Sequence, residues 1–378
     1  MVQIQFLDKN IVSVLVPVFS TRPECVVFLY DTRTVSERGK KDIEDAIKMR
    51  LPKTRVQFER VNMHMIDEIK SVLERVVDIY KNHEIEVDIT GGSELMTACG
   101  LWVCREHNLT PIYADYYTER IFHVFTYERL YEIEHISFDD YLTAVGGKYL
   151  ASSDETPEEA DFDRITRTAE YIFSHMYAWK EFFRHITNGY SATGIMSFSM
   201  GKLARNRQCM DLLHVFLREG FCEQQGKDSY RFSSEIDKRR MTVYGIWLEM
   251  YIYIKASECY DEVLMGTHID WNDSDHMDLN DNEIDVLVMR RSQPIFISCK
   301  MTEVKKEAVY EVNALAKRLG GDYAKSFVAT TDRLSEIKDE ASGMYQRLVK
   351  MKVGLIEVND FKKKKASDVF ARALQMTE

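Results

Sequence analysis

The sequence lacks the patterns that mark membrane-spanning and secreted proteins. Its longest apolar run, residues 11–19, is broken by Ser13 and Pro17 and is far too short to span a bilayer. The N-terminal residues show no basic stretch followed by an apolar segment and a small-residue cleavage site, so we expect no secretory signal peptide. The seven cysteines include no CxxC pair, which favours reduced thiols in a cytoplasmic protein that has no membrane partner.

Other absences exclude classes of chemistry. The sequence has neither an HExxH zinc motif nor a GxxxxGK[ST] loop, so a zinc protease and an ATPase are not indicated. No cysteine has a histidine at motif spacing, which argues against a cysteine nucleophile. The net charge of −11 argues against a general nucleic-acid coat protein. The one basic run, residues 362–365, is more typical of a solvated helix face than of a phosphate contact.

The length of 378 residues allows two or three domains. Strand-like and helix-like segments alternate over residues 1–126, which predicts βαβ units and a Rossmann-like α/β fold with a mostly parallel sheet. We place this domain at residues 1–134. A helical or winged-helix-like connector is expected at 135–240, and a second α/β domain at 241–378.

The connector and the start of the last domain contain recognisable elements. An amphipathic helix at 210–219 is followed by a hairpin around Gly226, which favours a winged-helix element used as a structural connector rather than as a DNA contact. One helix is predicted over 241–259, with Glu249 among its apolar residues, and another over 302–319.

A predicted hairpin over residues 283–300 carries the main candidate site. Side chains alternate across a strand, so Glu283 and Asp285 share one face, while Ser298 and Lys300 share a face of the next strand. The hairpin can bring Asp285 and Lys300 together. A carboxylate can hold Mn²⁺ or Mg²⁺, and a neighbouring ammonium can position a water and offset phosphate charge, which together suit phosphodiester cleavage.

The alternative is an edge hairpin with solvated charges. An unpaired carboxylate within an apolar strand is costly, however, which favours a functional site at Asp285.

A glycine pair marks a second candidate site. Thr90-Gly91-Gly92-Ser93 follows a predicted strand and precedes a helix, so backbone N–H groups could approach a phosphate there. The alternative is an ordinary strand-to-helix turn with Ser93 as the N-cap. A further strand ends at Asp31, and ligands bind at such strand ends in doubly wound sheets. The candidate ligand-binding residues are Thr32, Arg33, Thr90, Gly91, Gly92, Ser93, Glu94 and Thr97.

These motifs carry a resemblance to known families. A helix with Glu249, a strand with Asp285 and a strand ending in Lys300 resemble the PD-(D/E)xK restriction-endonuclease-like fold, and the glycine pair in a doubly wound sheet resembles a CARF nucleotide-sensing domain. Together they resemble the CARF nucleases of type III CRISPR systems. The resemblance implies a homodimer that binds a cyclic oligoadenylate, most often the tetra-adenylate, and then cleaves DNA or RNA with Mn²⁺ or Mg²⁺.

Two residues depart from the family pattern. Ser298 stands where the nuclease family has a carboxylate, so the second metal-binding carboxylate must come from Glu249 or Glu283, with Glu303 and Glu311 less favoured. The resemblance also implies the backbone carbonyl of Cys299 as a ligand. Glu94 lies near the position where many CARF domains have a lysine.

Two other functions stay open from the sequence. One is a ligand-controlled transcription regulator whose C-terminal lobe is inactive. The other is a CARF pocket that itself cleaves the cyclic ligand.

Overall fold

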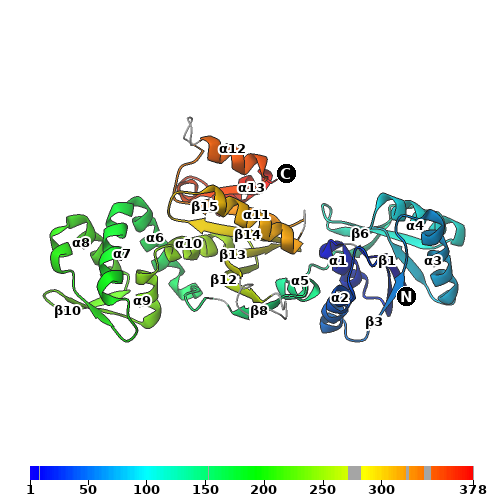
Figure 1. Cartoon of the computed structure of the whole chain (residues 1–378), viewed down its shortest axis with the longest axis horizontal. Helices are drawn as coiled ribbons and strands as arrows, with labels where there is room; N and C mark the ends of the chain where they lie inside the picture. The colour runs from blue at the N-terminus through cyan, green and yellow to red at the C-terminus, as the bar shows by residue number, and fades with distance from the viewer. Residues whose placement is uncertain (8, 152, 271–281, 321–322, 336–341, 378) are drawn as a thin grey trace.

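The structure is a computed structural model that describes residues 1–7, 9–151, 153–270, 282–320, 323–335 and 342–377. Three units lie in a row, with the C-terminal α/β unit between the N-terminal domain and a winged-helix unit (Figure 1). The predicted fold class is confirmed. No helix of the described residues has the length and apolar character needed to cross a membrane.

The N-terminal domain is built on a seven-stranded sheet of order β3-β2-β1-β4-β5-β6-β7. Neighbouring strands from β3 to β5 run parallel, and β6 and β7 are antiparallel additions. Because strand order reverses beside β1, the loops after β1, β2 and β4 meet at one edge of the sheet, where ligands bind in such folds. The strands are β1 (Val2–Phe6), β2 (Cys25–Tyr30), β3 (Arg55–Arg60), β4 (Ile85–Asp88), β5 (Thr110–Asp115), β6 (Arg120–His123) and β7 (Arg129–Glu132).

Helices cover both faces of this sheet. One face packs against α3 (Ile66–Ile79) and α4 (Glu94–His107). The other face packs against α1 (Ile11–Thr21) and α2 (Glu37–Arg50). Ser36 and Ser93 are the N-caps of α2 and α4, and the Ser93 cap is the one considered in the sequence as an alternative to a phosphate site.

A proline inside α1 explains how a glutamine side chain can be buried beneath this helix. Pro17 has no N–H, so the carbonyl of Ser13 loses its partner within the helix. The Nε2 of Gln5 donates to the Ser13 carbonyl at 2.7 Å and to the Val14 carbonyl at 3.1 Å. Gln5 can therefore lie fully buried on the central strand β1.

The winged-helix unit follows the order expected for that motif. The three-stranded sheet β10-β11-β9 lies beside the helices and ends in a hairpin. Its aromatic core includes Trp179, Phe182 and Phe216. The elements are α6 (Phe162–Ser174), α7 (Met176–Tyr190), β9 (Ser197–Phe198), α8 (Arg207–Arg218), β10 (Cys222–Gly226), β11 (Ser229–Phe232) and α9 (Glu235–Thr242).

The C-terminal unit is a six-stranded sheet of order β16-β15-β14-β13-β12-β8. Strands β14, β15 and β16 are parallel, whereas β8, β12, β13 and β14 pair antiparallel. The helices α10 and α13 cover one face, and α11 and α12 cover the other. The elements are β8 (Lys148–Ala151), α10 (Ile246–Ser257), β12 (Glu262–Asp270), β13 (Asn282–Arg290), β14 (Gln293–Lys300), α11 (Lys306–Gly320), β15 (Lys325–Thr330), α12 (Ser342–Lys350), β16 (Gly354–Glu357) and α13 (Ala366–Gln375).

Three expectations about local structure were wrong. The helix predicted over 241–259 is two helices, because Val243 is extended between α9 and α10. The helix predicted from residue 302 begins at Lys306. Residues 362–365 are exposed as expected, but they do not form one helix face, because Lys362 ends a 3-10 helix (Val358–Lys362) and Lys365 is the N-cap of α13.

The units share hydrophobic cores with their neighbours. One core joins the winged-helix unit to the α10 face of the C-terminal sheet. Another joins α1 and α2 to the α11 face of the same sheet through α5 (Phe138–Ala144). Strand β8 extends this C-terminal sheet, although the sequence assigned its residues to the connector. The C-terminal unit is therefore packed against both of its neighbours.

Candidate functional site

The β13–β14 hairpin places Asp285 beside Lys300, as predicted. The ladder between the two strands ends at the Val286–Ile297 pair, so Asp285 lies just beyond it. Its Oδ2 accepts from the Cys299 N–H at 2.6 Å and from the Ser298 hydroxyl at 3.4 Å, and lies 3.5 Å from the Lys300 Nζ. Every hydrogen bond shown for Asp285 in the described part of the chain uses this one oxygen, which leaves Oδ1 for another ligand.

The backbone of Cys299 also faces this carboxylate. Its thiol is buried in the core on the α10 side, and burial raises the pKa of that thiol well above its usual range. In an extended strand the N–H and C=O of one residue point to the same side. Because the N–H of Cys299 meets Asp285, the Cys299 carbonyl is directed to the same side and suits the ligand role that the sequence suggested.

A cavity of about 270 Å³ opens beside these residues. Its polar wall combines three carboxylates with the lysine and the serine of the hairpin, and its floor is apolar. The polar lining residues are Glu283, Asp285, Ser298, Lys300 and Glu311. Glu311 on α11 was one of the less favoured carboxylates, yet the packing of α11 against β14 brings it to this wall. Glu303 instead lines a neighbouring cavity of about 730 Å³.

Glu249 approaches the site from α10, on the opposite face of the sheet. Burial and, to a smaller extent, the charges of Asp285 and Glu283 raise its pKa from 4.5 to about 8, against the opposing effect of Lys300. A carboxyl group that stays protonated near neutral pH because it is buried and lies near other carboxylates would be stabilised as an anion by a cation.

This shift predicts how stability depends on pH. In the unfolded chain Glu249 loses its proton near pH 4.5, whereas in the folded protein it does so near pH 8. Between these values the folded state binds the extra proton, so stability falls as pH rises. We expect Glu249→Gln to raise the melting temperature of metal-free protein at pH 8 and to change it little at pH 4.5. Melting curves in a chelator at pH 4.5, 6.5 and 8 would test this, and an equal shift at all three values would contradict it.

The residues fit a divalent cation that prefers oxygen. Asp285, Glu283 and Glu249 offer carboxylates and Cys299 offers a carbonyl, and these are the donors that Mg²⁺ and Mn²⁺ prefer. Across the described residues, the one group of three such side chains with ligand atoms within 4.8 Å of one another is Glu74, Glu106 and His107. The carboxylates around Asp285 are thus more widely spaced than that group.

The second site lies at the edge of the N-terminal sheet. Arg33 donates from Nε to the Oδ1 of Asp31 at 2.9 Å and also bonds that carboxylate through Nη2, and it donates to Asn62 at 2.8 Å. The hydrogen bond from Arg33 holds the pKa of the Asp31 carboxyl well below its usual range. The Arg33 side chain is 59% exposed, so this buried carboxylate aims an accessible guanidinium at the edge of the sheet.

The glycine-pair loop follows β4 on the other side of β1. The Thr90 hydroxyl donates to Asp88 at 2.5 Å and accepts from the Ala114 N–H at 2.8 Å, which fixes the loop to β5. Burial raises the pKa of Asp88 to about 7. Gly92 has a φ of +91°, and Gly92, Ser93 and Glu94 are exposed. The Ser93 hydroxyl accepts from the Met96 N–H as the N-cap of α4.

The remaining predicted ligand residues divide between exposed and covered positions. Thr32 is exposed in the loop after β2. Thr97 is half-buried on the first turns of α4, and Gly91 is buried. The predicted ligand-binding residues therefore lie together at one edge of the sheet. Thr90 and Gly91 are the less exposed residues of the loop and lie beneath the others.

The geometry changes which substitutions test this second site. A Cβ at Gly92 would lie 3.0 Å from the Phe6 Cβ, and its positive φ disfavours a side chain. Gly92→Val should therefore lower the melting temperature even without ligand. We expect Thr32→Val and Arg33→Gln to weaken cyclic oligoadenylate binding while Thr32→Val leaves melting unchanged. Calorimetry that shows unchanged affinity in both variants would reject this location.

The topology adds residues that the sequence interpretation missed. Lys9 and Asn10 follow β1, between the loops that were predicted, and Asn62 follows β3 and holds Arg33. The apolar–polar alternation of Val2–Phe6 could have identified β1 and hence the loop after it.

Comparisons with known proteins agree with this architecture. Residues 236–365 match the family described as the Card1-like endonuclease domain. The comparison with curated protein sequences gave no match.

Solved structures resemble the whole chain. Protein VC1899 from Vibrio cholerae aligns with a TM-score of 0.78 and 14% identity, over 99% of this chain and 98% of that one. Can2 from Sulfobacillus thermosulfidooxidans, solved with cyclic tetra-adenylate, aligns with a TM-score of 0.70 and 16% identity, over 100% and 99%. A type III CRISPR defence DNA nuclease activated by cyclic oligoadenylate aligns with a TM-score of 0.53 and 13% identity, over 87% of this chain and 45% of that one.

The hairpin with Asp285 and Lys300 lies inside the matched segment, and the full-length likeness extends through the N-terminal sheet. The predicted resemblance is therefore confirmed: residues 236–365 match the Card1-like endonuclease domain, and the chain shares its fold with Can2 and with a type III CRISPR defence DNA nuclease.

Proposed function

We propose that this protein is a nuclease that cleaves phosphodiester bonds of nucleic acid with Mn²⁺ or Mg²⁺ after a cyclic oligoadenylate binds its N-terminal domain. The observation that carries the proposal is the Asp285 carboxylate, which meets Lys300 and the Cys299 N–H beside a polar cavity within an endonuclease domain. An adjoining acid and ammonium in one cavity suit hydrolysis of a phosphate ester.

Each residue has a defined role in this proposal. Asp285 would hold the cation together with Glu249 or Glu283 and the Cys299 carbonyl. When bound, the cation supplies a Lewis acid and an activated water. Lys300, whose side chain is 34% exposed, orients the attacking water and stabilises negative charge on the phosphate. Ser298 contributes a hydroxyl that holds the Asp285 carboxylate in place.

The N-terminal site would take the cyclic ligand. Arg33 offers a charge-assisted contact to phosphate, and the exposed Gly92–Ser93 turn lies at the N-terminus of α4, where anions are favoured. Can2, which shares the fold, was solved with cyclic tetra-adenylate, which makes that ring the first ligand to test.

A homodimer fits the apolar surface of this domain. Trp102 on α4 is 61% exposed, and Tyr113, Phe125 and Tyr127 are exposed near β5 and β6. Exposed aromatic side chains of this kind mark an interface. A second copy of the domain would cover them and give a two-fold pocket that matches a symmetric ring.

We expect cleavage to be low without ligand and to rise strongly when cyclic tetra-adenylate is added with Mn²⁺. The test is incubation with labelled single- and double-stranded DNA and RNA, with and without the ligand, and with a chelator as the metal control. Full cleavage without any cyclic nucleotide would contradict ligand control, and a stable monomer with full ligand-activated cleavage would contradict the dimer.

A second candidate function is ligand-controlled transcription regulation. It rests on the winged-helix unit, where Lys202, Arg205 and Arg207 are exposed near the start of α8, the helix that would enter a groove of DNA. This candidate predicts no cleavage under any condition and ligand-dependent binding of one DNA sequence.

A further inference from the structure

One residue of the turn that joins β13 to β14 is fully buried, although hairpin turns normally lie in solvent. Arg290 pairs with Gln293, so Arg291 and Ser292 form a two-residue turn. Both have positive φ, 47° and 65°, the conformation of the type I′ turn in which glycine or asparagine is favoured. Ser292 is fully buried. Contacts outside the hairpin therefore hold this turn.

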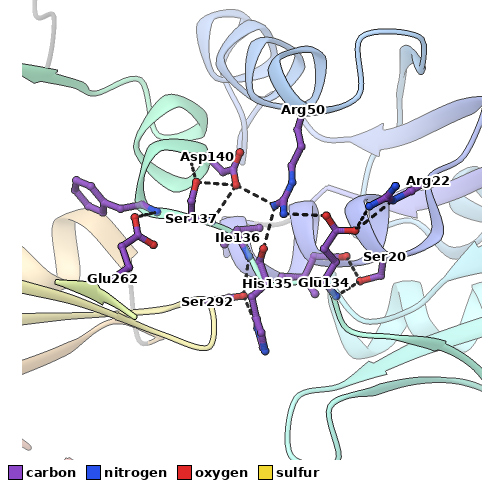
Figure 2. Close-up of polar contacts among 12 residues, drawn as sticks. Ser20, Arg22, Arg50, Glu134, His135, Ile136, Ser137, Asp140, Glu262 and Ser292 are labelled. Atoms are coloured by element: carbon purple, nitrogen blue, oxygen red, sulfur yellow. Dashed lines mark hydrogen bonds and ion pairs between the residues drawn. The ribbon is translucent and has the colours of Figure 1, made fainter. Parts of the chain in front are cut away.

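Those contacts come from residues 134–138, the segment that leaves the N-terminal domain (Figure 2). The Ile136 N–H donates to the Ser292 hydroxyl at 3.0 Å, and the His135 Nδ1 lies 3.0 Å from the same oxygen. The His135 Nε2 lies 2.7 Å from the Oε2 of Glu119, in the connection between β5 and β6. One assignment of protons satisfies every atom: Ser292 donates to Nδ1, and the Nε2–H donates to Glu119.

The same carboxylate also reaches the turn directly. The Oε1 of Glu119 lies 3.3 Å from an Nη of Arg291. A second contact runs beside it, because the ring of Tyr116 lies 6.0 Å from that of Tyr323, whose carbonyl accepts from Gln293 at 2.9 Å. The β5–β6 connection of the N-terminal domain is thus joined to the catalytic hairpin at three points. We call Glu119, His135 and Ser292 the clasp.

The segment between the domains is itself fixed on the sensor side. Arg50 on α2 donates to the His135 carbonyl at 2.9 Å and to Asp140 at 3.0 Å, and it pairs with Glu134 at 2.8 Å. Glu134 also pairs with Arg22 at 2.8 Å (Figure 2). His135 therefore moves with the N-terminal domain rather than freely.

The contacts of the clasp lead back, within the N-terminal domain, to the glycine-pair loop of the candidate ligand site. The hydroxyl of Thr90 accepts from Ala114 on β5, and Tyr116 and Glu119 follow directly along the chain. At the other end, Asp285 lies six residues before the turn, or about 20 Å along an extended strand. A continuous series of bonded groups therefore connects the glycine-pair loop to the catalytic hairpin. A displacement of the loop can be transmitted along it.

We propose that the clasp is the positioning contact through which the N-terminal domain sets the orientation of the β13–β14 hairpin, and hence of Asp285 and Lys300. This inference rests on the proposed function. Ligand binding shifts the protein between two arrangements of the clasp according to its affinity for each. His135 and Ser292 belong to neither the lining of the cavity beside Asp285 nor the candidate ligand residues, so their loss uncouples the two sites without removing either.

The test compares His135→Ala and Ser292→Ala with wild type in cleavage with and without cyclic tetra-adenylate. We expect unchanged cleavage without ligand, unchanged ligand affinity by calorimetry, and a ligand-induced rise that falls at least about fivefold, the lower end of coupling between sites. His135→Asn, whose amide can still accept from Ser292, should restore part of the response. His185→Ala is the matched control, because His185 is another half-buried histidine, bonded to the Ser199 carbonyl at 2.6 Å in the winged-helix unit.

Hydrogen exchange of residues 282–300 separates this proposal from the proposed function. Ligand should change exchange of the hairpin in wild type and in His185→Ala, but not in His135→Ala. Such a change without any cleavage would refute the nuclease activity and support the clasp. Full ligand activation in both clasp variants, or a wild-type protein that binds ligand with no change in the hairpin, would overturn the clasp. Absence of ligand binding to wild type would overturn both.

Discussion

Lys300→Ala and Asp285→Ala should each abolish metal-dependent cleavage and leave ligand binding intact. Lys300 is the one cationic side chain that lines the cavity beside Asp285 in the part of the chain that the structure describes, so its loss removes the group proposed to stabilise charge on the phosphate. Asp285 is the acceptor for Ser298, Cys299 and Lys300 together. We expect a loss of at least about a thousandfold, typical of an essential electrostatic group.

The measurement is cleavage of labelled nucleic acid with Mn²⁺ and saturating ligand, with ligand affinity determined by calorimetry. Lys255→Ala is a suitable control, because Lys255 also forms a partly buried ion pair, with Glu258, in the same unit but away from the cavity. Wild-type cleavage in either Lys300→Ala or Asp285→Ala would show that the active site has been misplaced.

Glu249→Gln or Glu283→Gln should weaken Mn²⁺ binding more than tenfold, because one of these carboxylates must replace the one that Ser298 cannot supply. Glu283 lines the cavity beside Asp285, and Glu249 reaches the site from α10. Ser298→Glu should preserve or raise Mn²⁺ affinity, since Ser298 also lines the cavity.

Calorimetric titration of Mn²⁺ into each variant would measure these effects. Glu311→Gln is an informative comparison, because Glu311 lines the same wall of the cavity from α11. Unchanged affinity in both Glu249→Gln and Glu283→Gln, or a large loss in Ser298→Glu, would contradict this ligand set.

Local patterns were sufficient to predict the catalytic hairpin. The alternation in β13 and β14 and the short polar turn between them determine which residues share a face, so the Asp285–Lys300 pair follows from neighbouring sequence. The cap at Ser93 was predictable for the same reason, since an N-cap depends on residues within one turn.

Features that depend on distant partners could not be predicted in this way. The position of Glu311 in the cavity depends on how α11 packs against β14. Strand β8 is recognisable only through its pairing with β12. The break at Val243 is marked locally only by Gly245, the N-cap of α10, and a single glycine within an apolar pattern does not by itself divide a helix.

The pairing of β8 with β12 also has a consequence for how the chain folds as it is made. The whole winged-helix unit lies between these two neighbouring strands, so the C-terminal sheet encloses it as an insertion. During synthesis β8 emerges long before its partner and must wait until that unit has left the ribosome. Closing so long a loop costs entropy and slows folding. A winged-helix unit that folds early would bring its own two ends together and so shorten the effective loop. Its folding would thus favour the pairing of β8 with β12 in the endonuclease sheet.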